Sequence, residues 1–142
     1  MGYKKNRKLT IAVAIDTSAS ISENDFKTFF AEITNIYQSG SNIILIECDA
    51  KVHTVAKFKK NHIPEFVGGG GTDFRPVFKA IGQKEDKLLM EKPDALIFFT
   101  DGYGIAPNMP NIPTLWCLTK NGRMPMNDNR EEISWGTVLH LE

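Results

Sequence analysis

The sequence predicts an α/β protein built on an open, mostly parallel, doubly wound sheet with one antiparallel edge strand. Apolar runs at 11–15, 43–46 and 96–99 are continuous rather than alternating, which is typical of strands covered by helices on both faces. A helical pattern lies between the first two runs. The 142 residues fit one domain, which we expect to occupy 1–142 with a basic arm at 1–8.

Six strands are expected from segments rich in apolar and β-branched residues, at 9–15, 42–48, 52–58, 95–100, 114–118 and, as the weakest, 137–141. The third segment is more mixed than its neighbours and follows the second after about three residues. Because so short a link permits only a hairpin, the third strand should be antiparallel and lie at an edge of the sheet.

Two helical segments are expected on the faces of this sheet. The first covers 23–38, where apolar side chains recur at three- and four-residue steps between an N-cap at Ser22 and a stop at Gly40. The second begins near Pro76, and its extension through 88–90 would be broken at Gly82.

The chain beyond the fourth strand has little room for helices, so we expect the C-terminal helices to be reduced. Twelve residues separate Asp101 from Thr114, and three of them are prolines, so no crossover helix fits there. The later polar link leaves room for at most a short helical turn near 129–133. Five apolar loop residues then either fill a compact core or form a docking surface: Met109, Ile112, Met124, Met126 and Trp135.

The composition argues against several classes of function. The 17 basic and 17 acidic side chains cancel, which disfavours a general nucleic-acid binder and a polybasic membrane anchor. No apolar run is long enough to span a membrane or to form a secretory signal, so we expect a cytoplasmic protein. Cys48 and Cys117 lie in apolar segments and should be buried, reduced thiols. Gly2 and the final residues, 141–142, could be cloning remnants on a piece of a longer protein.

Oxygen-bearing side chains follow the first and fourth predicted strands, where the carboxyl ends of parallel strands meet at one edge of the sheet. A glycine run at 68–71 leads to a further hydroxyl, and its glycines would let that loop approach closely. Two carboxylates and three hydroxyls form an oxygen-only set, which favours a hard cation such as Mg²⁺. The candidate ligands are Asp16, Ser18, Ser20, Thr72 and Asp101.

This set of motifs resembles the von Willebrand factor A (VWA) domain and its metal-ion-dependent adhesion site (MIDAS). Asp-x-Ser-x-Ser follows the first strand, a threonine lies on a distant loop, and Thr-Asp-Gly follows the fourth strand. The resemblance covers 9–141 and implies a Rossmann-like fold. It makes Ser18, Ser20 and Thr72 hydroxyl ligands of Mg²⁺, or of Mn²⁺. Asp16 and Asp101 would hold the ion directly or through waters.

The resemblance also implies a function. In the VWA family an acidic group of a partner protein completes the coordination of the metal, which makes the domain a non-catalytic binding module. The glycine run with the residues after it resembles a bacterial VWA-like branch that follows a metallopeptidase-like region in longer proteins, and a MoxR-type AAA+ ATPase is suggested as partner. Asp73 would either cap the next helix or support the ligands from outside, while Gly71 and Gly102 would shape their loops.

Two other functions compete with this interpretation. Asp16, Asp49, Asp73 and Asp101 could serve a metal-dependent phosphohydrolase or nuclease. Against this, Ser18 stands where a haloacid-dehalogenase-like phosphatase would have its second Asp, and no general base is identifiable. A nucleotide-binding glycine loop is disfavoured because the run lacks the Gly-Lys-Ser/Thr of a P-loop.

Overall fold

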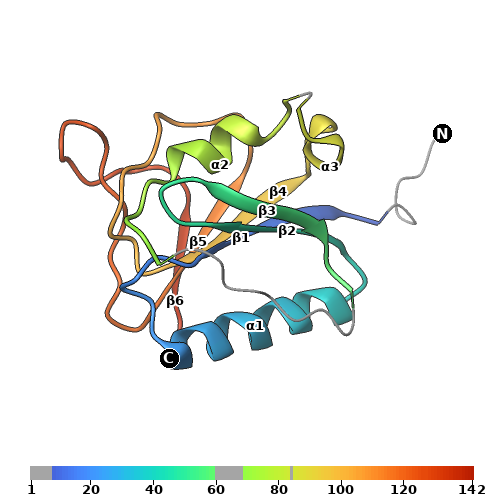
Figure 1. Cartoon of the computed structure of the whole chain (residues 1–142), viewed down its shortest axis with the longest axis horizontal. Coiled ribbons are helices and arrows are strands. Elements are labelled where there is room, and N and C mark those ends of the chain that lie inside the picture. Colours follow the sequence, from blue (N-terminus) through green and yellow to red (C-terminus); the bar gives the residue numbers. More distant parts are fainter. Residues whose placement is uncertain (1–7, 60–68, 84) are drawn as a thin grey trace.

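One six-stranded sheet, in the order β3-β2-β1-β4-β5-β6, forms the centre of the protein (Figure 1). The computed structural model describes residues 8–59, 69–83 and 85–142, so most of the expected N-terminal arm and Gly68 lie outside the described residues. Neighbouring strands pair in parallel except β2 and β3, which confirms the predicted fold class and its antiparallel edge strand. The strands are β1 Thr10–Asp16, β2 Asn42–Cys48, β3 Val52–Lys57, β4 Ala95–Thr100, β5 Thr114–Leu118 and β6 Thr137–His140.

β1 and β4 lie side by side in the middle of the sheet, and their register positions the candidate site. Ile15 of β1 pairs with Phe99 of β4, so the next residues, Asp16 and Thr100, end the two strands together. β1 begins and ends one residue later than predicted, which makes Asp16 its last residue. Asp16 pairs with Cys48 of β2, so this carboxylate is carried by a paired strand residue and not by a loop.

α1, Glu23–Gln38, covers one face of the sheet and has the predicted bounds (Figure 1). Its start is fixed by a capping box, in which Ser22 Oγ accepts from Asp25 N at 3.1 Å and Asp25 Oδ2 accepts from Ser22 N at 3.2 Å. The buried Phe29 of α1 packs on Phe99 of β4, with ring centroids 5.3 Å apart. This packing fixes the β1–α1 loop against the carboxyl edge.

Two short helices, α2 (Arg75–Ala80) and α3 (Lys87–Met90), cover the opposite face (Figure 1). The predicted break between them is present at Gly82, whose φ of 82° lies in the left-handed region that favours glycine. Phe74, directly before α2, packs on Phe98 and Trp116 with ring centroids 5.0 and 5.5 Å apart. These rings anchor the loop that carries Thr72 to the sheet.

Within the described stretch 85–142, the half of the sheet beyond β4 is covered without additional helices between its strands, as the short links predict. Among the described residues, no helix lies between β4 and β5 or between β5 and β6, and 129–133 hold a turn and an isolated bridge instead of a helical turn. β6 is exposed along its length. Ile112 is buried and Trp135 packs against the core, whereas Met109 is 77% exposed. Core filling thus accounts for most of the apolar loop residues, with Met109 as an exception.

Three further observations bear on the sequence expectations. Cys48 and Cys117 are both free and buried, as predicted. Leu141 is buried among the residues that pack on α1, and its N–H donates to the Leu118 carbonyl at 2.7 Å, so it is integrated into the fold. No helix in the described part of the chain is long and apolar enough to cross a membrane.

Candidate metal centre

Asp16 is the most deeply buried member of the candidate site, with none of its surface exposed. Its Oδ1 accepts a hydrogen bond from Ser18 N at 2.8 Å, and its Oδ2 accepts one from the Thr100 hydroxyl at 2.6 Å. Burial raises the pKa of Asp16, the hydrogen bonds from Thr100 and Ser18 oppose that shift, and the charge of Asp101 adds to it. The carboxylate is therefore oriented by neutral donors, and its charge is not offset.

Thr100 belongs to the Thr-Asp-Gly motif, but the sequence predicted no role for it in the site. It is fully buried, donates to Asp16, and accepts a hydrogen bond from Gly102 N at 3.0 Å. One hydroxyl thus connects the end of β1 with the turn after β4. The sequence could have indicated this role, because Thr100 precedes Asp101 at the end of the fourth strand, which was expected to end at the same edge as the first strand.

Two of the predicted hydroxyl ligands lie together beside Asp16. Ser18 Oγ and Ser20 Oγ are 3.2 Å apart, so both side chains turn to the same side of the β1–α1 loop, as their spacing predicts. Ser18 is buried and Ser20 is exposed, so the pair reaches from the interior to the surface. The site is consequently open to solvent at one end.

Asp101 follows β4 and is 7% exposed, with its Oδ1 accepting from Tyr103 N at 3.2 Å. The turn after it requires glycine. Gly102 has a φ of 83°, and a Cβ there would lie 1.5 Å from the Arg123 carbonyl oxygen. Gly102 therefore lets the loop after β5 pack directly on the segment that carries Asp101, which agrees with the loop-shaping role expected for it.

The loop that carries Thr72 is tied to the β1–α1 loop by backbone hydrogen bonds. Gly69 N donates to Thr17 O at 2.8 Å, and Ala19 N donates to Gly70 O at 3.2 Å. Thr72 itself packs against Gly104 beyond β4, where a Cβ would lie 2.9 Å from Thr72 Cγ2. The structure thus brings the Thr72 segment to the same edge as the other candidate ligands.

The glycines that permit a close approach of the Thr72 loop are not all the expected ones. At Gly71 an added Cβ would meet nothing within 4 Å, so this residue is not needed for a close approach. Close contact occurs instead at Gly70, where a Cβ would lie 3.0 Å from Asp49 Oδ2, and at Gly104.

Asp49 and His53 form a pair beside the site that the sequence argument did not find. His53 Nε2 lies 2.7 Å from Asp49 Oδ1, and Asp49 Oδ2 accepts from Gly70 N at 3.2 Å. Burial tends to raise the pKa of Asp49, but the hydrogen bond from His53, with smaller contributions from backbone donors, brings it below the usual value. Asp49 thus serves as an anchor for the glycine loop.

Asp73 forms an ion pair with Arg75, the first residue of α2. Arg75 Nε and a terminal guanidinium nitrogen donate to its two oxygens at 3.0 and 2.9 Å, and Arg75 N also donates to Oδ1 at 3.0 Å. Although burial opposes it, this pairing lowers the pKa of Asp73. Asp73 therefore accepts a backbone hydrogen bond at the first residue of α2, but the N-cap residue of this helix is Phe74, which makes no side-chain capping bond.

The residues present fit a hard cation by their chemistry. The Ser18 hydroxyl lies between the Ser20 hydroxyl and the Asp16 carboxylate. Within the described ranges, the Thr72 hydroxyl makes no hydrogen bond. Two buried carboxylates, Asp16 and Asp101, share the edge with them. Across the described chain, no three His, Cys, Asp or Glu side chains gather as a metal site. Any ion here would therefore depend on hydroxyl and water oxygens beside two carboxylates.

Comparisons with known proteins bear on the fold. A solved structure of an aerotolerance-related membrane protein from Bacteroides fragilis, with multiple mutations to serine, is similar with a TM-score of 0.58 at 10% identity. The similarity covers 89% of this chain and 76% of that chain. At so low an identity it supports the architecture alone.

Comparisons of the sequence bear on the family. An uncharacterized protein of Thermotoga maritima is 31% identical over 109 residues, which cover 75% of this chain. The chain spans only 26% of the length of that curated relative. The family model described as "VWA-like domain (DUF2201)" matches residues 11–142. The chain therefore belongs to the VWA-like domain (DUF2201) family.

Proposed function

We propose that this domain is a metal-dependent protein-binding module. Mg²⁺ or Mn²⁺ would be held by Asp16, Ser18, Ser20, Thr72 and Asp101, and an acidic side chain of a partner protein would complete its coordination. VWA-like domains are usually non-enzymatic interaction modules, which supports the binding class. The MoxR-type AAA+ ATPase suggested by the VWA resemblance, which would be met in the cytoplasm, is part of the same proposal.

The observation that carries the proposal is the buried, uncompensated charge of Asp16. Neutral donors orient its two oxygens, Asp101 lies close enough for its charge to raise the pKa of Asp16, and two hydroxyls stand beside it. Burial of an ionised carboxylate is unfavourable. Burial raises the pKa of Asp16 even though hydrogen bonds from Thr100 and Ser18 oppose that shift, so these neutral donors stabilise its charge only in part. A divalent ion would offset that charge and would use the hydroxyl oxygens as further ligands.

The decisive experiment is calorimetric titration of Mn²⁺ and Mg²⁺ into the wild type and into Asp16→Asn. The variant keeps a side-chain oxygen for Ser18 N but lacks the charge, so we expect metal binding to be lost. Asp128→Asn removes a carboxylate that the structure places at the surface, and it should bind metal as the wild type does. Equal binding by wild type and Asp16→Asn would refute the proposed site.

The same preparations test the enzyme alternative. Two of the four candidate acidic residues for a phosphohydrolase or nuclease already form ion pairs within the chain, Asp49 with His53 and Asp73 with Arg75. We therefore expect no phosphatase or nuclease turnover with Mn²⁺ above that of Asp16→Asn. Robust turnover that disappears in Asp101→Asn would replace the binding proposal with a catalytic one.

A further inference from the structure

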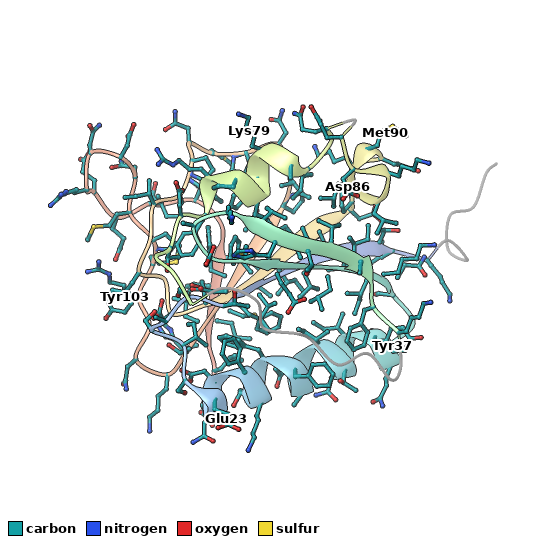
Figure 2. The ribbon with its side chains drawn as sticks, viewed as in Figure 1. Glu23, Tyr37, Lys79, Asp86, Met90 and Tyr103 are labelled. Carbon is teal, nitrogen blue, oxygen red and sulfur yellow. The ribbon has the colours of Figure 1, made fainter. Side chains whose placement is uncertain are left out.

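A cation–π pair lies on the rim of the candidate metal centre. The guanidinium carbon of Arg123 is 4.4 Å from the centroid of the Tyr103 ring. Arg123 is exposed and Tyr103 is 49% exposed, so both present surface to a partner. Figure 2 shows Tyr103 at the end of the molecule where the parallel strands finish. The pair is thus a surface feature at the same end as the site.

Both residues are fixed to the segment that carries Asp101. Tyr103 N donates to Asp101 Oδ1 at 3.2 Å, and Arg123 N donates to the Asp101 carbonyl at 3.0 Å. The loop after β5 also packs on Gly102 through the Arg123 carbonyl, an approach that only glycine permits. The aromatic ring in turn supports the guanidinium. The position of this positive charge is therefore set relative to a proposed metal ligand.

The charge of Arg123 has no carboxylate partner in the described ranges, where His53 pairs with Asp49 and Arg75 pairs with Asp73. Two carboxylates and a divalent cation sum to zero, so the proposed metal centre has no net charge left to attract a second acidic side chain of the partner. The unpaired guanidinium of Arg123 at the rim supplies a separate positive charge for that second side chain. Its planar fork can also accept a carboxylate through two hydrogen bonds.

We propose that Arg123, held on the Tyr103 ring, binds a second carboxylate of the partner, so that the surface recognises an acidic peptide segment rather than a single acidic residue. This inference rests on the proposed function, because the first carboxylate would bind the metal. Arg123 and Tyr103 act as specificity-determining residues, and the metal ligands provide the common anchor. Charge complementarity defines the partner as a segment with two neighbouring acidic side chains.

The test uses synthetic peptides as probes. Glycine–serine peptides with one Asp, or with a second Asp placed one to four residues away, are titrated into the ¹⁵N-labelled wild type in Mg²⁺, and chemical shifts are followed. We expect at least one paired spacing to bind about fivefold or more tightly than the single-Asp peptide. Arg123→Gln should reduce that preference to less than about twofold, and Arg123→Lys should give an intermediate value.

Lys120→Gln is the matched control, because it removes the same charge from an exposed residue of the same loop. It should retain the preference for paired acids. The inference is overturned if no paired peptide binds more tightly than the single-Asp peptide, if neither binds, or if Lys120→Gln abolishes the preference as fully as Arg123→Gln. Failure of the proposed function is recognised separately, as absence of metal binding in the calorimetric titration without peptide.

Discussion

In the described part of the chain, four aspartates lie at the carboxyl edge of this sheet, and they fall into two contrasting pairs. Asp49 and Asp73 each contact a basic side chain, and the pKa of each is below its usual value despite burial. Asp16 accepts hydrogen bonds only from neutral donors among the described residues, and burial raises its pKa. The same residue type at the same edge therefore has two opposite electrostatic environments.

The contrast separates structural carboxylates from a candidate ligand. Asp49 fixes Gly70, and Asp73 accepts from Arg75 N where α2 starts, so their charges are used within the chain. Asp16 also accepts hydrogen bonds, from Ser18 N and the Thr100 hydroxyl, but within the described part of the chain no basic side chain pairs with its charge. A protein that retains an uncompensated buried charge keeps it at a cost in stability, which is the pattern expected of a binding site. Each prediction below tests this division between the two pairs.

The largest expected effect is on metal affinity. Asp101→Asn should weaken Mn²⁺ binding by about 100-fold or more, because it removes one of two charges that face the ion. Asp73→Asn should leave the affinity within about threefold of the wild type, because Arg75 already holds that carboxylate. Calorimetric titration of the two variants side by side measures both. Comparable losses of Mn²⁺ affinity in the two variants would contradict the division between structural carboxylates and metal ligands.

The second effect is on stability. At Mn²⁺ concentrations about 100 times the Kd, the wild type should gain about 2.7 kcal/mol in free energy of unfolding, and EDTA should reverse the gain. Asp16→Asn should gain nothing from metal. Without metal it should be at least as stable as the wild type, because a charge in an unfavourable environment has been removed. Thermal and urea unfolding with and without Mn²⁺ check both statements, and a metal-free variant less stable than the wild type contradicts them.

The sequence predicted the fold more fully than the site. Local rules explain the continuous apolar runs, the periodicity of 23–38 and the break at Gly82. The fold class, α1 and the split between α2 and α3 could therefore be predicted from them. The convergence of Asp16 with the serines followed from spacing after a strand. Such features depend on nearby residues, which a sequence displays directly.

Contacts between distant segments could not be predicted in the same way. Thr100 donates to Asp16 across 84 positions, and Gly70 contacts Asp49 across 21. Arg123 reaches Tyr103 only because Gly102 admits the loop after β5. Strand adjacency brings these segments to one edge, but side-chain partners there depend on register and loop path. The division between paired and unpaired carboxylates therefore emerged only with the structure.

The third prediction concerns the pH dependence of stability at Asp49. A lowered pKa stabilises the fold at pH values above the usual carboxyl pKa, and this contribution is lost as the pH falls through the lowered value. Asp49→Asn should therefore cost about 1 kcal/mol near pH 6, and the difference from the wild type should shrink below about pH 4. Urea unfolding at both pH values measures it. A difference that stays constant with pH would mean that the carboxylate charge is not what stabilises the glycine loop.

The smallest effect is expected at the other paired carboxylate. Arg75 is exposed, and surface ion pairs contribute little to stability, so Arg75→Gln should shift the Tm by no more than about 2 °C. Lys79→Gln, which removes an exposed charge from the same helix, provides the control. The informative readout is metal affinity, because the variant frees Asp73 while leaving its carboxylate in place. If Mn²⁺ then binds within about twofold of the wild-type affinity, Asp73 is excluded from the site by its position. A gain beyond about fivefold would show that only the Arg75 pairing keeps it out, so that the two pairs differ in their partners and not in their access to the metal.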